Sequence, residues 1–195
     1  MRLPERTADE VRIGVAITVP EPYGAQLQEA RARFGDPWAP YIPPHVTLLG
    51  PTVVARSQLA QVDEHLTRVA AAHRAFLMRL HSTGTFRPVS PVVFVQVAAG
   101  IADCEALEGA IRTDVLAQDL HFHYHPHVTV AHELPDDQLD VAFDQMIDFD
   151  AAFVVSQLHC YEHGDDGVWR TRRDFALRGA SRTADAPQPS RPATR

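Results

Sequence analysis

The sequence contains the same tripeptide twice, and this repetition limits the possible folds more than any other feature. His45-Val46-Thr47 and His127-Val128-Thr129 stand in separate halves of the chain. Each copy continues into a run of apolar and β-branched residues, which is typical of a β-strand. Each also follows an earlier strand-like run at a similar distance, the runs being centred on Val15 and Val95. The chain is therefore predicted to be an internal duplication with one copy of the tripeptide in each repeat.

Strand and helix signals alternate in the same order in both halves. The first half has strand signals at 11–19, 45–54 and 75–86, with helical spacing at 24–34 and 57–73. The second half has strand signals at 91–99, 125–134, 151–163 and 168–178, with helical spacing at 102–119 and 136–148. We therefore predict an α+β fold with two βαβαβ repeats, in which antiparallel-rich sheets are related by a pseudo-twofold axis and line a central cleft.

The predicted domain covers most of the chain. We expect a single domain over residues 1–180, with lobes at about 11–86 and 91–178, and a disordered tail at 181–195 that is rich in proline and small polar residues. The start of the sequence has no apolar leader, and no run of residues has the length of a membrane span. We expect a soluble, cytoplasmic protein that does not contact a membrane, and nothing in the sequence demands more than a monomer.

The charged residues exclude several mechanisms. The net charge is −7, which argues against nonspecific coating of nucleic acid but leaves room for a cleft that holds one or two phosphates. All 18 basic residues are arginine. Without lysine the chain can have neither a P-loop nor Schiff-base chemistry, and it cannot adenylylate its own lysine as ATP-dependent ligases do.

The two tripeptides carry groups suited to phosphoryl transfer. Alternate side chains of a strand point to opposite faces, so His45 and Thr47 share one face, as do His127 and Thr129. Histidine titrates near neutrality, and a pair can therefore supply one general base and one general acid. Threonine hydroxyls can donate hydrogen bonds to the nonbridging oxygens of a phosphate. We expect this chemistry to need no metal and no cofactor.

The motifs and their flanks, PPHVTLLGP at 43–51 and HPHVTVAH at 125–132, resemble the paired signatures of the 2H phosphoesterase superfamily. That superfamily includes 2′-5′ RNA ligases that are also RNA 2′,3′-cyclic phosphodiesterases. The resemblance spans about residues 11–178, although only the motifs and their flanks are diagnostic. It implies that His45 is the proton donor, that His127 is the proton acceptor, and that Thr47 and Thr129 hold the phosphate. The implied substrate is an RNA end or a cyclic nucleotide.

Residues near the motifs are candidates for further substrate contacts. Tyr41, with Trp38 beside it, and Tyr124 could stack on a base, although a lid or core role explains them equally well. His125 is expected to line the cleft or its rim. Arg87, at the turn between the halves, could bind a flanking phosphate, as could one of the arginines near the last strand.

Two other functions fit parts of the sequence. The same cleft could bind a nucleotide or an RNA end without turning it over, although the complete motifs count against this. A metal hydrolase could use the alternating His121, His123, His125 and His127, since closely spaced histidines bind zinc or copper. Against a metal site, Pro126 interrupts the strand pattern and no H-E-x-x-H motif or Cys/His cluster accompanies the histidines.

Overall fold

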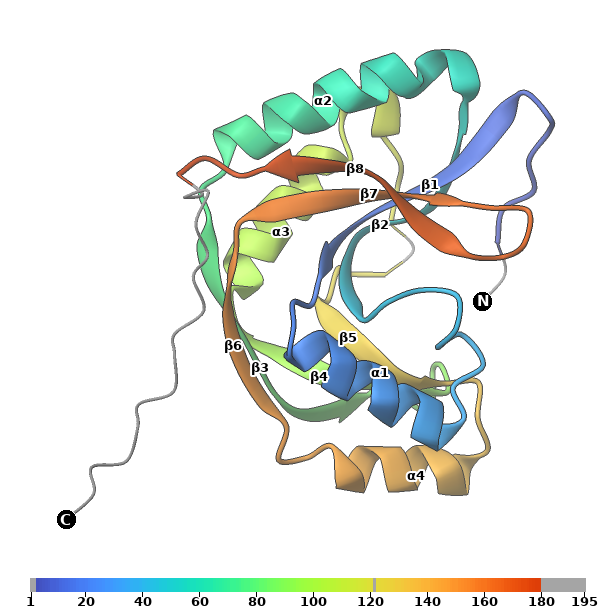
Figure 1. Cartoon of the computed structure of the whole chain (residues 1–195), viewed down its shortest axis with the longest axis vertical. Coiled ribbons are helices and arrows are strands. Elements are labelled where there is room, and N and C mark those ends of the chain that lie inside the picture. The colour runs from blue at the N-terminus through green and yellow to red at the C-terminus, as the bar shows by residue number, and fades with distance from the viewer. Residues whose placement is uncertain (1–2, 121, 180–195) are drawn as a thin grey trace.

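A computed structural model describes residues 3–120 and 122–179, and within these residues it contains two four-stranded sheets and four α-helices (Figure 1). The expected tail at 181–195 lies outside the described residues. The strands of the first sheet are β1 (Glu10–Thr18), β2 (His45–Ala55), β7 (Gln157–His163) and β8 (Trp169–Ala176). Those of the second sheet are β3 (Phe76–Thr85), β4 (Val92–Ala99), β5 (His127–His132) and β6 (Asp150–Val155).

The two sheets have matching strand orders. The first runs β2-β1-β7-β8 and the second β5-β4-β3-β6, with every neighbouring pair antiparallel. The motif strands β2 and β5 therefore occupy the same edge position in their sheets, each beside the first strand of its own repeat. This arrangement confirms the predicted α+β fold with two related antiparallel sheets.

The repeats exchange strands. β3, the third strand of the first repeat, pairs with β4, and β7 from the second repeat pairs with β1. Only a short turn connects β3 to β4, and strands joined in this way usually pair with each other. The boundary between the sheets therefore does not follow the sequence boundary expected between 11–86 and 91–178.

The helices pack against both sheets. They are α1 (Tyr23–Phe34), α2 (Leu59–Ala72), α3 (Ile101–Ile111) and α4 (Asp136–Gln145), together with the 3-10 turns η1 (Arg56–Gln58) and η2 (Asp114–Leu116). α1 contacts β5 and α3 contacts β2, so these helices also pack against the motif strand of the opposite repeat. In Figure 1, α2 lies along β8 and α4 lies beside α1 at the opposite end of the molecule.

Beyond shifts of up to three residues at element ends, two predicted elements differ from the structure. The strand expected at 151–163 is divided at Ser156, where the chain passes from the second sheet to the first, and the Ser156 carbonyl accepts a hydrogen bond from the Leu177 N–H (2.9 Å). The helix expected at 102–119 ends at Ile111. Asp114 has a φ of 51°, and a helix cannot continue through that backbone conformation.

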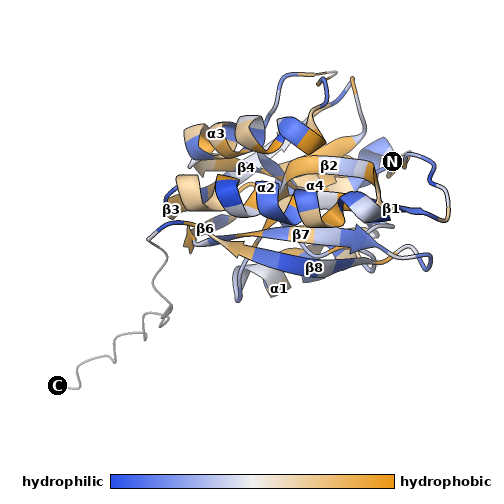
Figure 2. Ribbon diagram, turned by 90° about the horizontal axis from the view of Figure 1, so that it is seen from above, coloured by the Kyte–Doolittle hydropathy of each residue, from blue (hydrophilic) through white to orange (hydrophobic). Residues whose placement is uncertain are grey.

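One continuous apolar core joins the two sheets and the helices. Figure 2 shows β2 and β4 mostly in hydrophobic colours, whereas β8 is largely hydrophilic. α2 buries Val62, Leu66 and Val69 on one face, as the spacing of an amphipathic helix predicts. None of the helices within residues 3–120 and 122–179 has the length and apolar character required to cross a membrane.

Candidate active site

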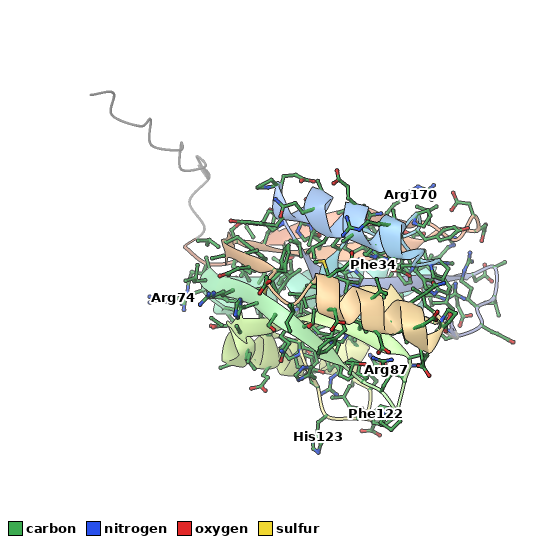
Figure 3. The ribbon with its side chains drawn as sticks, turned by 90° about the horizontal axis from the view of Figure 1, so that it is seen from below. Phe34, Arg74, Arg87, Phe122, His123 and Arg170 are labelled. Carbon is green, nitrogen blue, oxygen red and sulfur yellow. The ribbon has the colours of Figure 1, made fainter. Side chains whose placement is uncertain are left out.

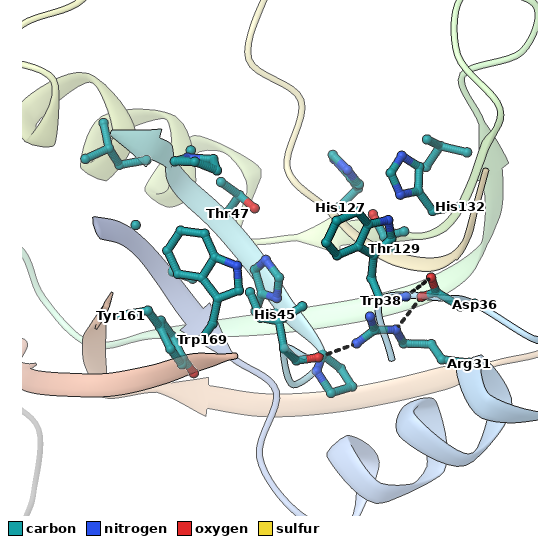
Figure 4. Close-up of a pocket in the computed structure, with 18 of the residues that line it drawn as sticks. Arg31, Asp36, Trp38, His45, Thr47, His127, Thr129, His132, Tyr161 and Trp169 are labelled. Carbon is teal, nitrogen blue, oxygen red and sulfur yellow. Dashed lines mark hydrogen bonds and ion pairs between the residues drawn. The ribbon is translucent and has the colours of Figure 1, made fainter. Parts of the chain in front are cut away.

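A cavity of about 400 Å³ contains both motifs. This volume falls within the range of roughly 300–1,000 Å³ that is usual for small-molecule sites. His45 and Thr47 line it from β2, and His127 and Thr129 line it from β5 (Figure 4). The four motif side chains thus meet at one site although they come from different sheets.

The alternation of the strands explains why these side chains face the cavity. Val46 and Val128 are fully buried, whereas the histidine and threonine on either side of each valine are partly accessible. The intervening apolar residues anchor each strand in the core and turn the polar ones toward the cavity.

Both imidazoles are held by the same local bond. Nδ1 of His45 lies 2.7 Å from the carbonyl oxygen of Pro43, and Nδ1 of His127 lies 2.7 Å from that of His125. A carbonyl only accepts hydrogen bonds, so Nδ1 carries the proton in both rings. Nε2 is therefore the nitrogen of each ring that can take up or release a proton.

The environment favours the neutral form of both rings. Burial lowers the pKa of His45 from 6.5 to about 4, the bond to Pro43 opposes this shift, and the charges of Arg31 and His127 lower the pKa further. Burial also lowers the pKa of His127, and its bond to the His125 carbonyl opposes the shift. Both rings are thus neutral at pH 7 before a ligand binds.

The cavity is also lined by a buried arginine that no motif of the sequence singles out. Arg31 of α1 is 3% exposed and forms an ion pair with Asp36, which is 4% exposed. Its position on the inner face of a regular amphipathic helix was the available signal, because an arginine is almost never buried unless it is paired.

Aromatic rings form much of the remaining wall. Trp169 and Tyr161 lie on the side of the first sheet, near His45, and Trp38 lies on the opposite side (Figure 4). Near His127, Phe86 makes an edge-on contact with the imidazole, the ring centroids being 4.9 Å apart. Such walls can pack against a flat, partly apolar ligand.

Of the other residues expected to contact substrate, Trp38 lines the cavity, whereas Tyr41, Tyr124, His125 and Arg87 do not. Tyr41 lies outside it, 38% exposed, with its ring 6.2 Å from that of Trp38. The side chain of His125 is exposed and lies beside His127, with the ring centroids 6.2 Å apart. Its carbonyl accepts the hydrogen bond from His127, and its charge contributes to the lowered pKa of that ring. Tyr124 is half-buried, and its hydroxyl donates to the main-chain carbonyl of Thr47 (2.9 Å).

Arg87 is directed toward α4. Its guanidinium donates to Asp140 (2.7 Å) and contacts Asp136, and these carboxylates raise its pKa. Figure 3 shows Arg87 beside α4, while Phe122 and His123 project from the loop that precedes β5. Within residues 3–120 and 122–179, no group of three or more His, Cys, Asp or Glu side chains is arranged to hold a metal ion; His121 lies outside these residues.

Comparison with known proteins identifies the family. The model of the 2′-5′ RNA ligase superfamily matches residues 19–167. The chain therefore belongs to this superfamily, and the resemblance found in its two motifs is confirmed.

Bacterial relatives match over most of their length. A protein of Bacillus licheniformis named "Putative phosphoesterase" is 28% identical over 149 residues, which cover 75% of this chain and 87% of that protein. A relative with the same descriptive name from Halalkalibacterium halodurans is 26% identical over 166 residues, covering 84% of this chain and 96% of the relative.

Solved structures share the fold. Escherichia coli LigT complexed with 3′-AMP has a TM-score of 0.63 at 16% identity, over 87% of this chain and 99% of LigT. A protein from Thermus thermophilus has a TM-score of 0.58 at 23% identity, over 87% of this chain and 100% of that protein. At these identities the likeness establishes the fold.

Proposed function

We propose that this protein is a metal-independent phosphoesterase that hydrolyses 2′,3′-cyclic phosphates, or cleaves and joins 2′-5′ linked RNA, with His45 and His127 as an acid–base pair. One observation carries the proposal. Two imidazoles from duplicated strands border the same cavity, and each has its Nδ1 fixed by a carbonyl, so that its Nε2 is left to exchange a proton.

In the proposed hydrolysis, the two histidine side chains account for both proton transfers. A water oxygen forms a bond to phosphorus while the bond from phosphorus to the 2′ or 3′ ribose oxygen breaks. His127 Nε2 takes a proton from the water, and His45 Nε2 gives one to the departing ribose oxygen. The hydroxyls of Thr47 and Thr129 donate to the nonbridging oxygens. If a 5′-hydroxyl approaches in place of water, the same steps join two RNA ends.

Binding of the substrate phosphate favours protonation of His45, which must carry a proton to act as the general acid. His45 is neutral in the empty cavity because its pKa is about 4. A phosphate diester carries a negative charge, and an opposite charge nearby favours the protonated imidazole. In this proposal His45 gains its proton as the substrate binds, while His127 stays neutral and acts as the base.

The names and ligands of the related proteins support a nucleotide or RNA substrate. The superfamily is named for 2′-5′ RNA ligation. LigT was crystallised with 3′-AMP and with ATP, which are nucleotides bound by that protein. A nucleotide with a cyclic or 2′-5′ linked phosphate would bring phosphorus to the two histidines and place its base against the aromatic wall.

Incubation with 2′,3′-cyclic AMP, followed by product analysis, tests the proposal. We expect a single nucleoside monophosphate, formed at an unchanged rate in EDTA, and its identity as the 2′ or 3′ isomer shows which oxygen departs. No turnover of cyclic phosphates or 2′-5′ dinucleotides, together with tight nucleotide binding, would instead favour the noncatalytic binding module. Activity that is lost in EDTA and restored by a metal ion would contradict a metal-independent reaction.

A further inference from the structure

Arg31 is held in place more firmly than a surface arginine. Its Nε donates to Asp36 Oδ2 (2.8 Å), and its Nη1 donates to the Ile42 carbonyl (2.7 Å) and contacts Gln28 Oε1 (3.3 Å). Asp36 in turn accepts from the main-chain N–H of Trp38 through Oδ1 (3.0 Å). These bonds fix the plane of the guanidinium at the wall of the cavity (Figure 4).

One nitrogen of this guanidinium, Nη2, forms no hydrogen bond with the described residues. Nη2 of Arg31 has no hydrogen-bond partner among the described residues, although the side chain is only 4% exposed. No buried side-chain nitrogen or oxygen within residues 3–120 and 122–179 lacks both a partner and access to solvent, so Nη2 has that access. A buried arginine with two nitrogens bonded and the third open to a cavity has an unused donor.

The cavity otherwise has little positive charge. Burial lowers the pKa values of His45, His127 and His132, which all line it. Arg31 is the single arginine or lysine among its described lining residues, and a guanidinium stays protonated at any physiological pH. Among the lining residues that the structure describes, a phosphate that enters this cavity therefore meets one permanent cation, Arg31.

We propose that Arg31 is an anion-binding residue of this cavity, which donates from Nη2 to an oxygen of the substrate phosphate. The inference rests on the function proposed above, and it adds a residue outside both motifs. Because Nε and Nη1 are already bonded within the protein, the guanidinium presents its third nitrogen without losing freedom when the phosphate arrives. The charge of Arg31 also lowers the pKa of His45, so a phosphate bound by Arg31 would relieve that repulsion and help His45 to take up a proton.

A purely structural role for Arg31 makes a different prediction. Its bonds to Asp36 and Ile42 fix the loop before β2, so any substitution of Arg31 could disturb His45 through this loop. The two roles are separated by a pair of variants that weaken the same ion pair. Arg31→Gln with Asp36→Asn removes the cation and keeps two amides that can hydrogen-bond. Asp36→Asn alone keeps the cation and removes its partner.

The test is titration of each protein with inorganic phosphate by calorimetry, with circular dichroism to verify folding. We expect the double variant to bind phosphate about ten- to hundredfold more weakly than the unmodified protein, as loss of a bond between charged groups predicts. Asp36→Asn should bind at least as tightly as the unmodified protein, because its cation is no longer neutralised. Arg172→Gln, which removes a largely buried arginine paired with Asp63 away from the cavity, should bind as the unmodified protein does.

Equal phosphate affinity in the double variant and the unmodified protein would overturn the inference. Equal weakening in the double variant and Asp36→Asn would also overturn it, because loop damage alone would then explain both. The result is independent of turnover. If the protein does not hydrolyse 2′,3′-cyclic AMP but loses phosphate affinity only with the Arg31 cation, the proposed function fails and the anion site stands. If the protein hydrolyses the substrate and the variants bind phosphate as tightly as the unmodified protein, the proposed function stands and the anion site at Arg31 fails.

Discussion

The two motif strands, β2 and β5, are alike within the strand and different in what surrounds them. In each, a proline precedes the histidine, and the carbonyl two residues before the histidine accepts from its Nδ1. In each, the hydroxyl-bearing threonine faces the same cavity two positions later. The local geometry is a property of the repeated sequence, since both copies produce it in separate sheets.

The surroundings are not repeated. His45 lies within the influence of the Arg31 cation, and its cavity wall continues into Trp169. His127 lies against the rings of Phe86 and Phe94, with ring centroids 4.9 and 5.0 Å away; the first contact is T-shaped and the second is tilted. The two motif strands therefore supply two equivalent groups, and neighbours outside the motifs make their electrostatic environments unequal. This inequality is what an acid–base pair needs, because the two groups must differ in protonation.

Substitution of either histidine tests the equivalence most strongly. We expect His45→Ala and His127→Ala each to lower kcat by about 10²- to 10⁴-fold, because each removes one of two required proton transfers. The measurement is the rate with 2′,3′-cyclic AMP, with thermal unfolding as the control for folding. Full activity in both single variants would end the acid–base assignment.

Substitution of either threonine should lower activity by a similar amount, and by less than substitution of a histidine. Thr47→Val and Thr129→Val keep the side-chain shape and remove one donor to the phosphate, so each should reduce kcat/KM by about ten- to hundredfold. Steady-state kinetics with the same substrate measures this. A large loss in one variant with none in the other would show that only one strand holds the phosphate.

Titration of the two imidazoles tests their difference. Since the folded pKa of His45, about 4, lies below its ordinary value of 6.5, the unfolded chain binds the extra proton between these pH values. The contribution of His45 to stability is therefore fully present above pH 6.5 and is lost as the pH falls toward 4. Relative to His45→Gln, the free energy of unfolding should fall by up to about 1.4 kcal/mol per pH unit in this window.

Nuclear magnetic resonance of the imidazole Hε1 protons provides the direct comparison. In the double variant that lacks the Arg31 cation, the pKa of His45 should rise, because Arg31 lowers it in the unmodified protein. Arg31 is not among the charges that shift His127, so that pKa should stay the same. Equal movement of both pKa values would contradict the difference in surroundings.

The smallest expected effect is on stability, from loss of the hydrogen bond that joins Tyr124, just before β5, to Thr47 of β2. Tyr124→Phe removes the hydroxyl that donates to the Thr47 carbonyl, and it should lower the free energy of unfolding by about 0.5–1.5 kcal/mol. Denaturant unfolding measures this. Tyr41→Phe is the matched control, because the Tyr41 hydroxyl has no hydrogen bond within the described part of the chain, and stability should not change.

The sequence was informative where local rules dominate. Alternation along the motif strands predicts that His45 and Thr47 share a face, and the recurrence of the motif predicts the related sheets. Single-residue roles outside the motifs depend on partners that are distant in the chain. Arg87 looks free at a turn, yet Asp136 and Asp140 of α4 lie within its reach. Arg31 looks like an ordinary helix residue until the loop of Asp36 and Ile42 folds over it.

Strand exchange between the repeats bears on how such a protein arose. A half-length ancestor with one motif would have had its first two strands side by side and its third directed away, unable to complete a sheet of its own. Two identical copies could satisfy each other by trading third strands, as subunits of a domain-swapped dimer do. Gene fusion would then have joined the partners at what is now the turn between β3 and β4. Today the two halves, made as separate polypeptides, should reassemble into one folded particle.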